Sequence, residues 1–124
     1  MTDLDEEGRP EPSLAGNEAE TLVGFLEFQR ATFAWKCAGV DANGLGKMVA
    51  ASSMTLGGML KHLALVEDYW FDQWLNGREG EPQWVTAHWD SDPDWEWHSA
   101  AENSPEQLHS FWQDSVARSR VLVL

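Results

Sequence analysis

Histidine is the side chain most able to do chemistry at neutral pH, and one of the four histidines in this sequence stands apart by its position. His62 lies inside a long helical pattern, roughly 90° from the centre of the apolar stripe when each residue turns ~100°. That angle places the imidazole at the border between the core and a cleft. It would either hydrogen-bond to a neighbouring side chain or bind a metal ion, and the spacing alone leaves both interpretations open.

The other three histidines, His88, His98 and His109, show no spacing that converges on a metal ion. We expect each to be a surface or loop histidine. The segment 90–94 (DSDPD) begins like an EF-hand loop, which needs Gly at its sixth position and Glu at its twelfth. Trp95 and Ala101 stand there instead, so a solvated acidic loop is the better interpretation.

Familiar catalytic motifs are missing from the sequence. It contains no Gly-rich phosphate loop, no Gly-x-Ser-x-Gly elbow and no Cys-x-x-Cys pair, so nucleotide, hydrolase and thiol-redox mechanisms have no support. Cys37 is the single cysteine and cannot form an internal disulfide, which is typical of a reducing compartment. We expect it to be a small buried side chain.

The amino-acid composition argues against several classes of binding partner. The net charge of -13 disfavours nucleic acid and anionic membrane surfaces, which are held by clusters of Lys and Arg. The acidic N-terminus is the opposite of a signal peptide and no apolar window could span a bilayer, so we expect a cytoplasmic protein. A hydrophobic fraction of 43% with 8 Trp indicates a folded chain, and 124 residues fit one domain.

Three helical patterns would position these residues, and the fold class predicted is all-α. The helices are expected at about 18–38, 55–76 and 104–122, the first and third opened by capping boxes. Gln29 falls in the apolar stripe of the first helix, so we expect it to be buried with a partner across the bundle. Gly57 and Gly58 in the second suggest close helix packing or room for a bound group.

The chain outside these helices divides into a tail and a crossover. Residues 1–16 are acidic and poor in large apolar side chains, and we expect a disordered tail before a domain at 17–124. Residues 78–103 hold four tryptophans, which will not stay in water, so this crossover should pack across the bundle as a cover.

Several runs of the sequence resemble the DinB/YfiT-like metalloenzymes, in the branch called mini-circle proteins. The runs that carry the resemblance are 50–71 (AASSMTLGGMLKHLALVEDYWF), 28–32 (FQRAT), 35–37 (WKC) and 92–97 (DPDWEW). Together they indicate that most of residues 9–120 resemble that family.

The resemblance implies a four-helix bundle of up-down-down-up topology, with a long crossover between helices two and three. It also implies a metal-dependent enzyme, with a divalent metal (Zn or Ni) held by one His of helix two and two ligands of helix four. Relatives use a low-molecular-weight thiol in S-transferase or isomerase chemistry, in which the metal-bound thiolate attacks an electrophile. Only His62 carries over as a ligand, because no counterpart of helix four precedes Leu124.

The chain is therefore expected to be C-terminally truncated relative to that bundle, lacking most or all of the fourth helix. Two functions follow from the resemblance. One is a thiol transferase with an incomplete metal site; the other is a non-catalytic binding or assembly module whose partner chain supplies the fourth helix. A bundle short of one helix leaves an apolar groove, so we also expect a homo-oligomer or another partner.

Overall fold

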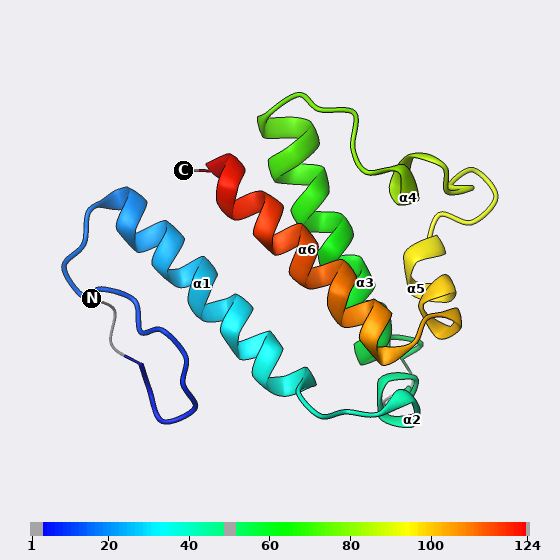
Figure 1. The fold of residues 1–124 in the computed structure, drawn as a ribbon, viewed down its shortest axis with the longest axis horizontal. Helices are drawn as coiled ribbons and strands as arrows, with labels where there is room; N and C mark the ends of the chain where they lie inside the picture. Colours follow the sequence, from blue (N-terminus) through cyan, green and yellow to red (C-terminus); the bar gives the residue numbers. More distant parts are fainter. Residues whose placement is uncertain (1–3, 49–51, 124) are drawn as a thin grey trace. The chain divides into compact units, whose positions relative to one another are not determined.

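The computed structural model describes residues 4–48 and 52–123, and its long elements are helices (Figure 1). It divides into two units, Met1–Gly39 and Val40–Leu124. Within the described residues there is no strand beyond an isolated bridge between Leu4 and Pro10. The all-α prediction is confirmed. The first residues of the run 50–71 and Leu124 lie outside the described residues.

The first unit contains α1 (Glu18–Cys37), which begins where the sequence predicts. Asn17 accepts a hydrogen bond from the backbone N–H of Glu20, and Glu20 accepts one from the backbone N–H of Asn17. This reciprocal pair satisfies two of the amide groups that every helix start leaves without a partner. Cys37 at the other end of α1 is fully buried, as predicted, and burial raises the pKa of its thiol to about 11.

The prediction that Gln29 is buried in α1 is wrong. Gln29 is exposed, and the next residue, Arg30, is buried and forms an ion pair with Glu27 one turn earlier. The long aliphatic stem of an arginine can cover apolar surface while its head keeps a charged partner. A periodicity count that treats Arg as polar therefore places the buried face one residue away from where it lies.

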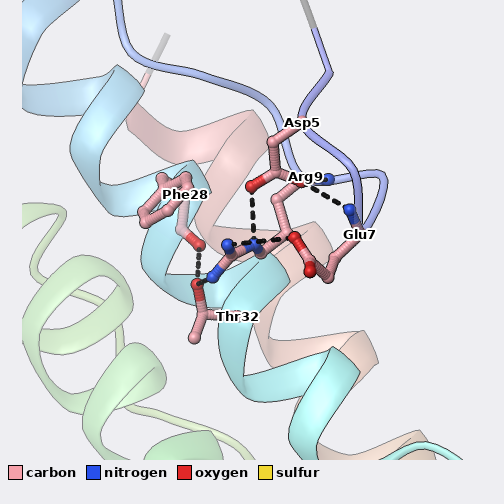
Figure 2. A network of polar contacts seen from close by, with 5 residues as sticks. All are labelled: Asp5, Glu7, Arg9, Phe28 and Thr32. Carbon is pink, nitrogen blue, oxygen red and sulfur yellow. Dashed lines mark hydrogen bonds and ion pairs between the residues drawn. The ribbon is translucent and has the colours of Figure 1, made fainter.

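An arginine before α1 ties the preceding turn to the helix (Figure 2). Arg9 donates to Asp5 Oδ2 at 2.8 Å and to Thr32 Oγ1 at 3.1 Å, and its guanidinium lies 4.6 Å from the ring centre of Phe28. Burial alone would raise the pKa of the Asp5 carboxyl, but hydrogen bonds from the backbone of Arg9 and Glu7 and the Arg9 charge lower it. Part of the segment 1–16 thus has specific contacts, and the boundary predicted at residue 17 stays a prediction.

The second unit is built on α3 (Leu56–Glu67) and α6 (Pro105–Val123), which lie side by side (Figure 1). Gly57 meets Leu108 and Asp68 meets Ser115, so the two helices run in the same direction. A parallel pair requires a long return between its members, and the crossover provides it. The two helix positions agree with the predicted ranges 55–76 and 104–122. The capping box of α6 forms as predicted, between Ser104 and Gln107.

The α3 helix continues as a π-helix, η1 (Asp68–Leu75), which the sequence did not predict. Four short helices also lie where turns or irregular chain were expected. They are α2 (Ala42–Leu45), α4 (Pro82–Val85), α5 (Trp95–Ser99) and the 3-10 turn η2 (Ala100–Glu102). No helix within residues 4–48 and 52–123 is both long and apolar enough to cross a membrane.

Close packing explains the two glycines that open α3. A Cβ at Gly58 would lie 2.5 Å from a ring carbon of Trp97, and one at Gly57 would lie 3.2 Å from Leu108. Contacts this short mean that a larger residue would push α5 or α6 away. Of the two predicted uses of these glycines, close helix packing is therefore the one observed. Contacts between α3 and the α5–η2 segment also place this part of the crossover against the helix pair.

Candidate functional site around His62

His62 projects from α3 toward the crossover and meets two side chains of α5. Its Nδ1 lies 3.1 Å from Glu96 Oε2, and its ring stacks on Trp97 with 5.0 Å between ring centres. The His62 side chain is 34% exposed, whereas the Glu96 side chain is 7% exposed. His62 therefore sits at the border between interior and solvent, as its angular position predicts, and its hydrogen-bond partner is Glu96 of the crossover.

The Glu96 contact fixes which nitrogen of His62 is available. With Nδ1 held by a carboxylate, Nε2 is the atom left for a proton or a metal ion. Metal-ligating histidines nearly always have such a carboxylate or carbonyl on the second ring nitrogen, which sets the tautomer and orients the ring. The geometry thus fits a single imidazole ligand.

A complete metal site does not form from the described residues. In the described ranges, 4–48 and 52–123, no group of three or more His, Cys, Asp or Glu side chains is placed to hold an ion. A mononuclear zinc site needs about three protein ligands. His62 with Glu96 supplies two at most, so this donor set does not fit the metal that the family resemblance implies.

The other three histidines differ from His62 in their exposure and contacts. His88 is exposed and His109 is half-buried. His98 is exposed and contacts both oxygens of Asp92 at 2.9 Å. That hydrogen bond, together with the Asp92 charge, raises the pKa of His98. The acidic segment 90–94 therefore has a histidine partner within the crossover.

Lys61 is a buried cation beside this site that sequence reasoning missed. The residue is 5% exposed, and its Nζ donates to Ser99 Oγ at 2.7 Å and to Asn103 Oδ1 at 2.8 Å. The ammonium also lies 4.3 Å from the ring centre of Trp95. Burial lowers the pKa of Lys61, and the charges of Glu102 and Glu96 partly offset that effect. Lys61 thus anchors the end of the crossover to α3.

A second buried network joins η1, α4 and α6 around Asp68, which has no exposed surface. Asp68 Oδ2 accepts from Trp84 Nε1 at 2.7 Å, from Ser115 Oγ at 2.9 Å and from Arg118 Nη2 at 2.9 Å. Arg118 Nε also donates to Asp68 Oδ1 at 3.2 Å. Every acceptor of this carboxylate is used, so the network is a structural tie.

The sequence contains one cue for the role of Glu96, but rules based on neighbouring residues do not detect it. Glu96 is a single carboxylate between Trp95 and Trp97, in a segment whose pattern has neither helical nor strand period. Only a packed crossover brings it to His62. A charged residue between two tryptophans, where the tryptophans must be buried, is the one cue that could have marked it.

The chain was compared with protein-family models, curated proteins and solved structures. A family model described as mycothiol-S-transferase matches residues 21–123. No curated protein and no solved structure matches the chain. The matched span includes most of α1, both long helices of the second unit, His62 and Glu96.

Proposed function

The chain belongs to the mycothiol-S-transferase family, and from this premise we propose that it is the helical part of a metal-dependent thiol S-transferase in which His62 is one metal ligand. Mycothiol-S-transferases form part of the DinB/YfiT-like group that the sequence resembles. The observation that carries the proposal is the contact of Glu96 with His62 Nδ1, which leaves Nε2 as the free nitrogen of an oriented ring.

The proposal assigns the remaining ligands to a polypeptide segment other than the described residues. Because the described part of the chain offers no third donor, the 124-residue chain alone should bind a divalent metal weakly and show no thiol transfer. The thiol would be a low-molecular-weight compound such as mycothiol, and the name of the matched family supports this part of the proposal.

Metal titration of matched variants tests the role of His62. We expect Zn²⁺ or Ni²⁺ to bind the chain no more tightly than about micromolar, since one imidazole cannot hold zinc firmly. His62→Ala should abolish this binding, and Glu96→Gln should weaken it about tenfold. His88→Ala removes an exposed histidine of the crossover and is the control. Tight metal binding that survives His62→Ala would place the metal elsewhere and refute the proposal.

The second candidate is a non-catalytic assembly module completed by a partner chain. It is favoured by the same incomplete donor set. Size-exclusion chromatography with metal analysis of each fraction separates the two. Tight, stoichiometric metal confined to an oligomer would indicate that another copy completes the site. Metal-free oligomers that lack transferase activity would favour the assembly module.

A further inference from the structure

A cavity of about 500 Å³ opens between the α3–η1 helix and the crossover. Its lining comes from residues 65–73 of the helix and 79–96 of the crossover, so both walls belong to the second unit. Small-molecule pockets usually measure ~300–1,000 Å³ and combine apolar walls with a few polar groups. This cavity has the size and composition of such a site, and neither the metal proposal nor the family match assigns it a ligand.

Aromatic side chains form much of the wall: Tyr69, Trp84 and Trp89. The two tryptophans are held in place, because each makes an edge contact with Trp95, at 6.3 Å and 5.5 Å between ring centres. Their indole N–H groups are already used, that of Trp84 by Asp68 and that of Trp89 by the Trp84 carbonyl. Trp84 is only 2% exposed, so Tyr69 and Trp89 offer most of the apolar and π surface to a ligand, and neither indole has a free N–H.

Charge in the lining has one sign. Glu79 and Glu96 line the cavity, and among its lining residues in the described chain none is Lys, Arg or His. Glu79 is exposed, whereas Glu96 is buried. Aromatic walls with carboxylates attract organic cations, through the ring quadrupole and direct ion pairing. An anion would meet two negative charges and find no basic side chain in the wall.

Glu96 also has unused hydrogen-bonding capacity. Two buried side-chain oxygens lack a hydrogen-bond partner in the described chain, Glu96 Oε1 and Asp72 Oδ1. Asp72 Oδ1 still has the Arg78 guanidinium at 2.9 Å. The Glu96 charge acts to raise the pKa of Lys61, but the Lys61 ammonium donates its hydrogen bonds to Ser99 and Asn103. A buried carboxylate oxygen without a donor is costly, and a ligand N–H that reached Oε1 through a small rotation of the Glu96 side chain would satisfy it.

We propose that this cavity binds a protonated amine carried on an aromatic or apolar body, with the ammonium donating to Glu96 Oε1 and the body lying against Tyr69 and Trp89. The need for an N–H donor separates this ligand from a quaternary ammonium, which could only use the π surfaces. Because Glu96 holds His62 through its other oxygen, Oε2, the same carboxylate serves both places. The amine site does not depend on a metal ion.

Calorimetric titration of the wild-type chain in EDTA, with four probes of one shape, tests the ligand class. The probes are phenethylamine, its trimethylated quaternary analogue, phenethyl alcohol and hydrocinnamate. Phenethylamine should bind at least roughly tenfold more tightly than each of the others, since a hydrogen bond to a charged group contributes that much or more. Equal affinity for the quaternary cation, the alcohol or the anion would overturn the proposal.

Three carboxylate-to-amide variants locate the ammonium. Glu96→Gln should weaken phenethylamine binding roughly tenfold to a hundredfold and leave phenethyl alcohol binding unchanged. Glu79→Gln, at an exposed position, should weaken amine binding only about two- to threefold. Glu106→Gln removes the same charge from the exposed surface of α6 and should change nothing. If Glu96→Gln fails to fold, the four probes and the Glu79→Gln variant still test the proposal. Unchanged amine binding in Glu79→Gln, together with no preference of the wild-type chain for the amine, would refute the site.

Discussion

Asp68 and Glu96 are both buried carboxylates of the second unit, yet their oxygens are satisfied very differently. Asp68 receives hydrogen bonds from Trp84, Ser115 and Arg118 and is completely enclosed. Glu96 has His62 on one oxygen and no hydrogen-bond partner for the other within the described chain.

This difference in hydrogen bonding distinguishes a structural carboxylate from one that is available to a ligand. A carboxylate whose acceptors are all used holds elements together, and removing it leaves several donors stranded. A carboxylate with an acceptor to spare contributes little to folding and keeps the capacity to bind something else. Asp68 should therefore matter for stability, and Glu96 should matter for ligands.

The largest expected effect is on Asp68. Asp68→Asn removes the negative charge that Arg118 faces. It also replaces one acceptor oxygen by an NH₂ group, which would point at groups that are themselves donors, so we expect a loss of about 3 kcal/mol in the free energy of unfolding. Urea unfolding followed by circular dichroism measures it. Ser115→Ala, which removes a single donor, is the control and should cost about 1 kcal/mol. A loss under about 1 kcal/mol for Asp68→Asn would remove the distinction between the two carboxylates.

Glu96→Gln is the matched acid-to-amide change, and its effect on stability should be much smaller. Its free Oε1 has no hydrogen bond to lose, and an amide oxygen can still accept from His62, so the free energy of unfolding should stay within about 1 kcal/mol of wild type. The same urea titration measures this. A loss as large as that of Asp68→Asn would mean that Glu96 is also a structural tie.

The smallest effect concerns an exposed histidine–carboxylate pair, His98 with Asp92. The hydrogen bond between His98 and Asp92 raises the pKa of His98 above that of the unfolded histidine. The pair therefore contributes its full stabilisation when the pH is below the unfolded pKa. That contribution disappears as pH rises through the folded pKa. Asp92→Asn should move the His98 pKa back toward its ordinary value, as measured by NMR titration of the ring. Asp90→Asn is the control, and an unchanged pKa in Asp92→Asn would contradict the pairing.

Local signals in the sequence were sufficient for the long helices. The capping boxes at Asn17 and Ser104 predicted two helix starts to the residue, because a cap depends only on side chains within one turn. Gly57 and Gly58 correctly indicated close packing. The π-helical turn of η1 was not predicted, since its two buried carboxylates are oriented by partners outside the helix, such as Arg118 and Arg78.

The candidate site was predictable only in part. The angle of His62 on its helix was enough to place it at the edge of the core. Its partner Glu96 is 34 residues away in sequence, in a segment without periodicity, so no local rule could join them. The wrong prediction for Gln29 has a similar cause. The neighbouring residue Arg30 is buried in its place, and the helical spacing alone does not show which of the two faces the interior. The predicted oligomer and the predicted truncation before the fourth helix stay predictions.

The π-helical segment η1 has a consequence for how this chain tolerates insertions and deletions. Each π turn closes its hydrogen bond one residue later than an α turn, so η1 has the register of a helix that has absorbed extra sequence. Deleting one residue within 68–75 could be accommodated by a return to α-helical winding. A deletion in α3 has no such reserve, because it would rotate every side chain on one side of the deletion by about 100° relative to those on the other side.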